Sequence, residues 1–560
     1  MAETVRIFAL GGLDEDGNNL YVVEAGEDII VMEAGSKYPD VSKPGIDLII
    51  PNYTYLKENK DRVRAYIITH GHDDLFGALP FIYRDVPAPV YVSNATKVMI
   101  EAFTKKRNLD INYDFKVIEP TSKHLINGRT VRFFQTTHMM MASSGVAIKT
   151  EQGYIVYSGD YIVEYNQDPN YSHDLNALAK ISEHKVLALL TESKGAERKG
   201  YTSPNHRLTP HFARPFQDAK GRIFVVVYDQ STYQLEEIIN MARQHEKKIY
   251  FYDDNVREYF KRFQSIGALK IPRAYVVDKD DILRVRQSDL VILIMGQGDE
   301  VYRQIALIAA KEHEDKRIVL DPSDTFIVAA PPAYNFENFA TQAIDDLYKT
   351  GVNVIKIGRR QLAPMHAAEE DIKMLLSLLK PKYYIPVTGD YKQMMANAKT
   401  AVSMRIGLNH NNIFLLENGN VVAFVDEKAK LSVVGPDVVA ASELYIDGIG
   451  VGDTSSGVLD DRSTLSKDGV VVMGISIDKF KRQIVAGPDI QMRGFIFVRE
   501  NDIVINELAK IYVEVVDRAL KAPGKLDIEL VSEEVEELVQ RYLWRETRRH
   551  PMVLPLISSI

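Results

Sequence analysis

The most informative run of the chain is Ala65-Tyr-Ile-Ile-Thr69-His70-Gly-His72-Asp73-Asp74-Leu75. Its apolar start predicts a buried strand, and the polar residues follow directly where that strand ends. Two imidazoles two positions apart, followed shortly by a carboxylate, can converge on one divalent cation once the chain turns. This run therefore predicts a metal site at a strand end.

Two further candidate ligands stand in similar settings along the chain. His138 ends the run Phe133-Phe-Gln-Thr-Thr-His138, and Asp160 ends the run Tyr157-Ser-Gly-Asp160. For any one such residue alone, a turn histidine or a capping aspartate is the more common role, by roughly four to one. The ordered combination reverses that preference and predicts one ligand set.

The composition sets limits on the kind of protein and on its metal chemistry. A chain of 560 residues is too long for one core, so we expect two or more domains, and three fit the pattern best. A hydrophobic share of 46% and a charged share of 26% are ordinary for folded proteins. With no cysteine, any metal must be held by His, Asp or Glu, which fits a reducing cytoplasm.

Neither secretion nor a membrane span is expected. The first residues lack a basic segment followed by a long apolar one, and no later segment approaches eighteen uncharged apolar residues. A net charge of −9 gives no overall attraction to nucleic acid, so an RNA substrate would need a local basic channel. We therefore expect a cytoplasmic protein whose substrate the overall charge leaves open.

Strands and helices alternate in the first part of the chain, which predicts an α/β fold. Short apolar runs separated by Gly-rich and Asp-rich turns predict buried strands. These strands are Val5–Leu10, Leu20–Glu24, Ile29–Met32, Ala65–Thr69, Ala88–Val92, Val131–Phe134 and Tyr154–Ser158.

A second strand and helix series interrupts the first one. It comprises predicted strands at Arg222–Tyr228, Ile249–Tyr252, Leu290–Ile294 and Arg317–Leu320, with a helix at Gln234–His245. The helix Glu369–Leu379 and the strand Tyr383–Val387 then resume the first pattern. This order predicts an inserted domain.

The last part of the chain predicts a small α+β domain. The sequence is rich in Val and Gly from Val425 to Asp461, which suggests a linker. Strands are predicted at Val470–Ser476 and Gly494–Val498, with helices near Ile503–Arg518 and Ser532–Arg541.

The ordered ligand pattern resembles that of the metallo-β-lactamase family, which has His-x-His-x-Asp-His, a later His, a later Gly-Asp and a final His. The resemblance implies that His70, His72, His138 and Asp160 hold a first metal ion. It implies that Asp74 and the bridging Asp160 are ligands of a second ion.

Two positions of the second site depart from the family pattern. Leu75 stands where the family has a His directly after the Asp, and Thr388 stands in the place of the final His, in Ile385-Pro-Val-Thr388-Gly-Asp390. We therefore expect one site for Zn²⁺ or Mn²⁺ and a second site that is weak or empty. Losing one ion of a two-metal hydrolase should cost several kcal/mol of barrier, so activity should be low.

Other segments resemble the ribonuclease J family of β-CASP proteins along nearly the whole chain. They include Glu192-Ser-Lys-Gly-Ala-Glu, Met365-His366-Ala-Ala-Glu-Glu and Gly487-Pro-Asp-Ile-Gln-Met-Arg-Gly-Phe. The resemblance implies a metallo-β-lactamase αββα sandwich with an inserted β-CASP α/β domain and a small α+β C-terminal domain. The expected bounds are 1–205 and 355–435 for the sandwich, 206–354 for the insertion, 436–460 for a linker and 461–560 for the last domain.

The resemblance also places catalytic and substrate-binding residues. It implies that Asp74 or Asp160 orients the attacking water, that Glu192 is the acidic residue of a β-CASP motif, and that His366 stabilises charge on the scissile phosphate. A helix N-terminus at the His366 segment is the plainer alternative, since Glu369 and Glu370 follow, and both can hold.

The implied phosphate pocket has lost donors. The substrate-binding positions are Gln230, Ser231, Thr232, Gly296, Leu362, Ala363, Pro364, Met365 and His366. Several hydroxyl and imidazole donors of the family are missing there, and Pro364 supplies no backbone N–H. We expect a 5′ phosphate to be gripped poorly.

The altered second site is similar to that of the second ribonuclease J paralogue found beside an active one in some Gram-positive bacteria. The resemblance implies a weak metal-dependent 5′-3′ exonuclease, with some endonuclease activity, in rRNA processing and mRNA decay. It implies RNA and the active paralogue as partners, in homo- or hetero-oligomers that are dimers or tetramers. The alternative is a non-catalytic RNA-binding or assembly subunit, and a small-molecule hydrolase is disfavoured because the inserted domain and the tail match a nucleic-acid enzyme.

Overall fold

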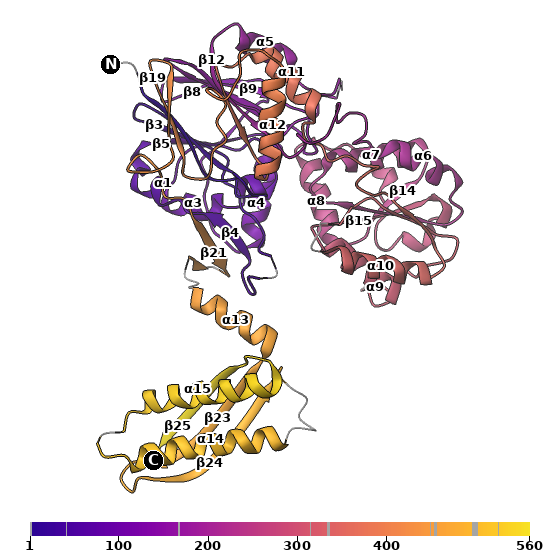
Figure 1. Ribbon diagram of the computed structural model, residues 1–560. Helices are drawn as coiled ribbons and strands as arrows, with labels where there is room; N and C mark the ends of the chain where they lie inside the picture. The colour runs from indigo at the N-terminus through magenta and orange to yellow at the C-terminus, as the bar shows by residue number, and fades with distance from the viewer. Residues whose placement is uncertain are drawn as a thin grey trace. The chain divides into compact units, whose positions relative to one another are not determined.

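Two β-sheets packed face to face form the part of the chain that carries the predicted ligands (Figure 1). This computed structural model describes residues 3–40, 42–165, 168–313, 315–332, 336–448, 450–452, 456–495, 502–524 and 526–560. The first sheet has the strand order β20-β19-β1-β2-β3-β5-β6-β7, with β1 Val5–Gly11, β2 Leu20–Ala25, β3 Asp28–Met32, β5 Val63–Ile67, β6 Val90–Val92, β7 Phe115–Val117, β19 Val421–Val425 and β20 Lys428–Ser432. The second has the order β18-β12-β11-β10-β9-β8, with β8 Lys123–Ile126, β9 Arg129–Gln135, β10 Ser144–Thr150, β11 Gly153–Tyr157, β12 Val186–Glu192 and β18 Tyr383–Val387.

Apolar side chains from both sheets meet in one core, and helices lie outside it. Ile7 and Ile67 of the first sheet share this core with Ile148 of the second. The outer face of the second sheet packs against α5 (Leu175–Ser182), α11 (Glu369–Leu379) and α12 (Tyr391–Ser403). Helices α1 (Thr54–Glu58), α2 (Asp73–Phe76), α3 (Leu79–Asp85) and α4 (Asn94–Lys106) come from the strand connections of the first sheet, and β4 (Leu48–Pro51) precedes α1. This arrangement is the expected αββα sandwich.

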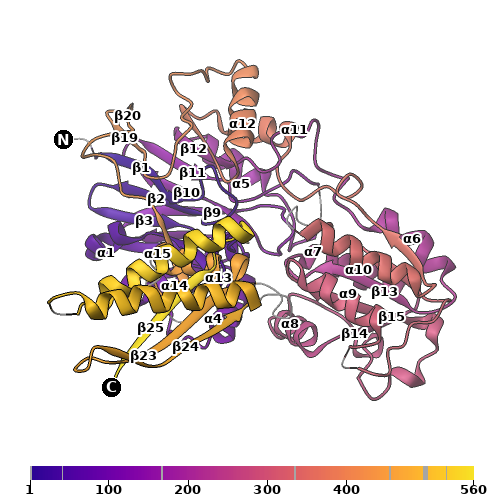
Figure 2. The ribbon, with the colours of Figure 1, turned by 60° about the horizontal axis from the view of Figure 1, so that its bottom comes forward.

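The inserted domain is a parallel sheet with helices on both faces (Figure 2). Its strand order is β14-β15-β13-β16-β17, with β13 Ile223–Tyr228, β14 Lys248–Phe251, β15 Leu290–Gly296, β16 Thr325–Val328 and β17 Asn353–Lys356. One face packs against α6 (Thr209–Asp218), α7 (Thr232–Gln244) and α8 (Asp254–Ser265), and the other against α9 (Glu300–Ala310) and α10 (Glu337–Lys349). This is the predicted α/β insertion.

The strand predicted at Arg317–Leu320 is wrong. That segment is a loop, in which Ile318 is buried but Val319 is 50% exposed. The chain reaches the sheet only after the turn that ends at Asp324, and Thr325 then pairs with Ile223. An apolar run without a sheet partner was mistaken for a strand, because its composition resembles one.

The chain divides into two compact units, and the second contains the C-terminal domain. The units are Met1–Lys37 with Ile49–Leu444, and Tyr38–Leu48 with Tyr445–Ile560. In the second unit, α14 (Asp502–Lys521) and α15 (Ile528–Thr547) cover one face of the sheet β24-β23-β25. Its strands are β23 Val470–Asp478, β24 Gln483–Arg493 and β25 Met552–Ser559.

Three features of this region differ from the sequence predictions. The stretch predicted as a linker contains β20, β21 (Glu443–Asp447), β22 (Gly450–Val451) and the start of α13 (Ser456–Asp468). Of the strand predicted at Gly494–Val498, the first two residues form a bend and residues 496–498 lie outside the described residues. Strands β24 and β25, which pair with β23 in antiparallel and parallel fashion, were not predicted.

Among the described residues, no helix is both long and apolar enough to cross a membrane.

Candidate metal centre

Three buried imidazoles meet at one edge of the sandwich. His70 and His72 follow β5, and His138 follows β9. One ring nitrogen from each lies within 4.8 Å of the others, and the exposed fractions are 0%, 7% and 0%. Buried polar groups cost free energy unless they have partners, so a cluster of this kind requires one.

Hydrogen bonds on the outer side of two rings fix which nitrogen faces the cluster. The Nδ1 atom of His138 lies 2.7 Å from the carbonyl oxygen of Met365, and the Nε2 atom of His72 lies 2.9 Å from that of Gln230. A carbonyl oxygen can only accept, so both of these nitrogens carry a hydrogen and donate. The lone pairs of His138 Nε2 and His72 Nδ1 are therefore left for the cluster.

The third ring is fixed by a two-step chain of hydrogen bonds. His70 Nδ1 lies 3.2 Å from the hydroxyl oxygen of Thr69, and that hydroxyl donates to Glu33 Oε1 at 2.6 Å. The lone pair of His70 therefore sits on Nε2, which lies 3.0 Å from His72 Nδ1. Two lone pairs at that distance repel each other unless a proton or a cation lies between them, so this pair is arranged for a cation.

The three imidazoles are held in the neutral form that metal binding requires. Burial lowers the pKa of His70 and of His138 well below the usual value, and the neighbouring imidazoles act in the same direction. Burial also lowers the pKa of His72 to about 4. Neutral rings keep their lone pairs at physiological pH.

Asp160 adds a carboxylate to the cluster. Its Oδ2 atom lies 3.9 Å from His70 Nε2 and 3.9 Å from His138 Nε2. Both Asp160 oxygens and His138 Nε2 are buried, and none of them has a hydrogen-bond partner within the described residues. Burial and then Glu192 raise the pKa of Asp160 to about 7.

The unpartnered atoms fit a divalent ion. Leaving a buried polar atom without a partner costs about 1–3 kcal/mol, and one cation would partner all of them. Neutral imidazole nitrogens with one carboxylate suit Zn²⁺ or Mn²⁺. The predicted ligands His70, His72, His138 and Asp160 are brought together as a group that could hold such an ion.

Asp74, the candidate ligand of a second ion, faces a lysine instead. The Nζ atom of Lys194 lies 3.0 Å from Asp74 Oδ2 and 2.9 Å from Asp16 Oδ1. Burial by itself would lower the pKa of Lys194, but Asp16 and Asp74 raise it well above its usual value, so the side chain is an ammonium ion. In the described part of the chain, ligand atoms converge in two groups of three, which are His70, His72 and His138, and His138, Asp160 and His366. Asp74 belongs to neither group.

The two altered positions are integrated into the fold. Leu75 is fully buried, and its carbonyl accepts a hydrogen bond from Ala34 at 2.6 Å. The hydroxyl of Thr388 lies 2.9 Å from the hydroxyl of Tyr21, and the backbone of Thr388 has a φ of 56°. Neither position offers a ring nitrogen to a second ion.

His366 is held beside the cluster by Glu192. His366 Nδ1 lies 2.7 Å from Glu192 Oε2 and 3.6 Å from Asp160 Oδ2. The other oxygen of Glu192 accepts from the backbone N–H of Tyr161 and of Ala367, both at 2.9 Å. Burial opposes protonation, yet Glu192 raises the pKa of His366 above its usual value. Glu192 therefore acts on His366 as a positioning residue.

The predicted phosphate-binding hydroxyls are used by the protein itself. Ser231 caps α7, where its hydroxyl accepts from the N–H of Gln234 at 3.2 Å. The hydroxyl of Thr232 accepts from the N–H of Met141 at 2.8 Å. Gln230 contributes its carbonyl to His72, as described above, and its amide donates to Asp73 at 3.0 Å.

The remaining phosphate-pocket positions are mainly structural in their contacts. Leu362 and Met365 are buried in the apolar core of the inserted domain, and the N–H of Ala363 donates to Asn205 at 2.9 Å. Pro364 is exposed. Gly296 ends β15 and pairs with Tyr228, close in sequence to Gln230. Their role in substrate binding remains a prediction.

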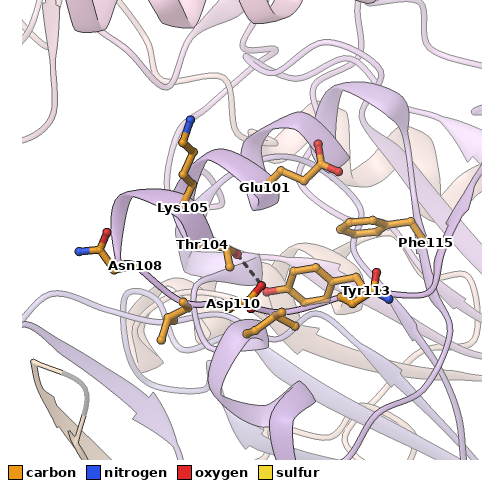
Figure 3. Close-up of a pocket in the computed structure, with 10 residues that line it drawn as sticks. Glu101, Thr104, Lys105, Asn108, Asp110, Tyr113 and Phe115 are labelled. Atoms are coloured by element: carbon orange, nitrogen blue, oxygen red, sulfur yellow. Dashed lines mark hydrogen bonds between the residues drawn. The ribbon is translucent and has the colours of Figure 1, made fainter.

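The cavity shown in Figure 3 lies away from these residues. It has a volume of about 460 Å³ and lies between α4 and the segment that leads to β7, with Thr104, Tyr113 and Phe115 among its lining residues. The hydroxyls of Thr104 and Tyr113 lie 3.0 Å apart within it. It contains none of the predicted ligands, so it gives no support to the metal centre.

Comparisons with known proteins cover the whole chain. Models of three domain families match: the metallo-β-lactamase superfamily at residues 13–252, the ribonuclease J β-CASP domain at residues 220–347 and the ribonuclease J C-terminal domain at residues 457–560. A protein named ribonuclease J 2 from Staphylococcus saprophyticus is 30% identical over 558 residues, which is 100% of this chain and 99% of that protein. The chain belongs to the ribonuclease J family. RNA is the substrate class of this ribonuclease family, and its first domain implies a divalent metal.

Other similar proteins agree with this assignment. Proteins named ribonuclease J 2 from Staphylococcus epidermidis and Staphylococcus aureus are 30% and 29% identical over 556 residues, which is 99% of this chain and 98% of each of them. A crystal structure of a protein of unknown function from Enterococcus faecalis covers 76% of this chain and 100% of its own, with 15% identity and a TM-score of 0.51. That likeness shows the fold alone.

Lys194 is the residue of this centre that sequence reasoning missed. It lies two positions after Glu192, at the end of β12, in a segment that served only to support the resemblance. No local pattern in the sequence marks it, because its partner Asp74 lies 120 residues earlier in the chain.

Proposed function

We propose that the protein hydrolyses RNA with one divalent metal ion, held by His70, His72, His138 and Asp160. The observation that carries this proposal is the set of inward-facing, unpartnered ligand atoms, His138 Nε2 and both oxygens of Asp160. The outward hydrogen bonds of the three imidazoles support it, because they fix the tautomers that metal binding needs. Membership of the ribonuclease J family supports RNA as the substrate.

The side chains around the ion have separable roles in this proposal. When bound, the ion supplies Lewis-acid stabilisation of charge on a phosphodiester. Asp74 or Asp160 orients the attacking water through a carboxylate oxygen. His366 donates from Nε2 to a phosphoryl oxygen, because its Nδ1 is bonded to Glu192. Against the effect of burial, Glu192 also raises the pKa of His366, which favours protonation of both nitrogens.

We propose that the activity is weak. Leu75 and Thr388 supply no ring nitrogens, and Asp74 is bonded to Lys194, so the second site lacks the donors of a complete one. The absence of a second ion should cost several kcal/mol of barrier. The substrate would be degraded from the 5′ end, with occasional internal cleavage, in the processing of rRNA and the decay of mRNA.

We also propose that the protein works in an oligomer with an active paralogue. Leu554 and Leu556 of β25 and Val485 of β24 alternate with residues that face α14 and α15, so they lie on the open face of the sheet. Their exposed fractions are 42%, 57% and 51%. Exposed apolar side chains on one sheet face are typical of a surface that another chain covers.

A non-catalytic RNA-binding or assembly subunit is the second candidate function. It is favoured by one observation, the integration of Leu75 and Thr388 into the fold, which a protein without turnover would tolerate. The two candidates differ in whether RNA is cleaved when the first site is filled.

The test combines ion counting with RNA cleavage by the full chain. The purified protein is titrated with Mn²⁺, the bound ions are counted by native mass spectrometry, and hydrolysis of a 5′-monophosphorylated RNA is followed. We expect one ion and slow, Mn²⁺-dependent cleavage, with both lost in His138→Ala. His206→Asn is the matched control, because it alters a buried imidazole outside the cluster, whose Nε2 lies 3.1 Å from Glu164 Oε2. An ion without cleavage would favour the assembly subunit, and no ion at all would reject the metal centre.

A further inference from the structure

Lys194 lies where the carboxylates of a second metal site would need a cation. Its ammonium group contacts Asp74 and Asp16 at 3.0 and 2.9 Å, and its side chain is 18% exposed. It also lies close enough to Asp160 for the two charges to affect each other. A lysine paired with two carboxylates beside a third is a compact positive charge in a carboxylate-rich setting.

The other second-site positions agree with such a replacement. Leu75 and Thr388 take the places of the two imidazoles that the family pattern provides, and both are buried. An ammonium ion needs no lone pairs from imidazoles, since it donates three hydrogen bonds and accepts none. Carboxylates alone are therefore sufficient partners for it, and Asp74 and Asp16 supply them.

We propose that the ammonium group of Lys194 takes the place of the second divalent cation and keeps that position closed to one. This inference rests on the proposed metal centre at the first site. Lys194 neutralises the carboxylate that a second ion would use, and its own charge repels a divalent ion brought to the same place. The loss of two ligand positions and the presence of Lys194 then have one explanation, which is that the charge of a lysine replaces the charge of a metal ion.

The deciding experiment counts Mn²⁺ ions in full-length variants. We expect one ion per chain in the parent and in Leu75→His/Thr388→His, because Lys194 still fills the position. We expect two ions once Lys194→Met is added to that pair, with the magnetic coupling of two neighbouring Mn²⁺ ions in the electron paramagnetic resonance spectrum. Two ions in the parent or in the double variant would overturn the proposal, as would a folded triple variant that binds only one.

Lys37→Met, combined with the same two histidines, is the matched control. Lys37 is 21% exposed and also pairs with two carboxylates, Glu15 and Glu443, outside the imidazole cluster. Its loss should leave the count at one. Failure of the parent to bind any ion would instead reject the proposed metal centre, so the two failures are distinguishable.

A single substitution keeps the proposal testable if the triple variant does not fold. Lys194→Met in the otherwise unchanged chain removes a positive charge next to the first site and frees Asp74. We expect Mn²⁺ to bind the first site about 10-fold more tightly in a titration. A lysine that only supported the structure would give unchanged or weaker binding, and either result would overturn the proposal.

Discussion

The two sides of the candidate metal centre differ in whether their side chains already have partners within the protein. On the first side, each imidazole has an outward hydrogen bond, and the inward atoms of His138 and Asp160 are left without partners. On the second side, Asp74 is bonded to Lys194 and Thr388 lies in contact with Tyr21. A cation would give the unpartnered atoms of the first side a partner, whereas Asp74 and Thr388 already have partners within the protein. A position that supplies no metal ligand can therefore be occupied by a side chain that makes ordinary contacts within the fold.

The largest expected effect separates Asp160 from Asp74. Mn²⁺ should stabilise the parent by about 2.7 kcal/mol at a concentration 100-fold above its Kd, because only the folded state binds it. Asp160→Asn should abolish this gain, and Asp74→Asn should keep it, since Asp74 already has Lys194 as its partner. The measurement is thermal unfolding with Mn²⁺ and with a chelator. Equal losses in the two variants would remove the distinction between the two sides.

A smaller effect is expected from the residues that orient the ligands. Thr69→Val removes the oxygen that accepts from His70 Nδ1 and should weaken Mn²⁺ binding by about 10–100-fold, the usual cost of losing such a partner. Thr388→Val makes the same change on the other side of the centre, where it removes the contact with Tyr21. Its effect on the first ion should be negligible. Calorimetric titration with Mn²⁺ compares the two, and a similar loss in both would contradict the assignment.

The smallest effect concerns Asp229, a buried carboxylate that belongs to neither side of the metal centre. Burial raises the pKa of Asp229 from 3.8 to about 7, with Asp73 acting in the same direction, and its Oδ1 has no hydrogen-bond partner within the described residues. Because the folded pKa is the higher one, the stability from the neutral group is fully present below pH 4 and is lost as the pH rises through 7.

Asp229→Asn removes that loss. The variant should gain on the parent as the pH rises from 4, and the difference should reach roughly 1–2 kcal/mol at pH 8. Urea unfolding at pH 4, 6 and 8 measures it. A difference that does not depend on pH would show that the carboxyl group is not protonated in the folded protein.

Most elements with strong periodicity could be predicted from the sequence. The helix Glu369–Leu379 and the strand Tyr383–Val387 were predicted with the bounds that they have. The wrong and the missing predictions lie where pairing in a sheet, and not the local sequence, determines the structure. Arg317–Leu320 is apolar but has no strand beside it, whereas β25 forms because it pairs with β23. Pairing between distant segments is not visible in a local pattern.

The candidate site could be predicted as far as spacing alone allows. His70, His72, His138 and Asp160 were selected from their order and their positions at strand ends, and they do lie together. The partner of Asp74 could not be found this way, because Lys194 reaches it across 120 residues of chain. The contact of Thr232 with Met141 was hidden for the same reason, since it depends on how the inserted domain packs, whereas the bond between Ser231 and Gln234 is a local helix cap.

The carbonyl of Gln230, which receives a hydrogen bond from His72, belongs to the inserted domain. The amide of the same residue donates to Asp73, so two hydrogen bonds join the inserted domain to the segment that contains His72 and Asp73. A movement of the inserted domain away from this segment, to admit a long RNA chain, must break both hydrogen bonds and release the ring of His72. In the proposed metal centre, separating the insertion from this segment would therefore also loosen the hold on the ion, and a molecule that kept the two apart would weaken metal binding.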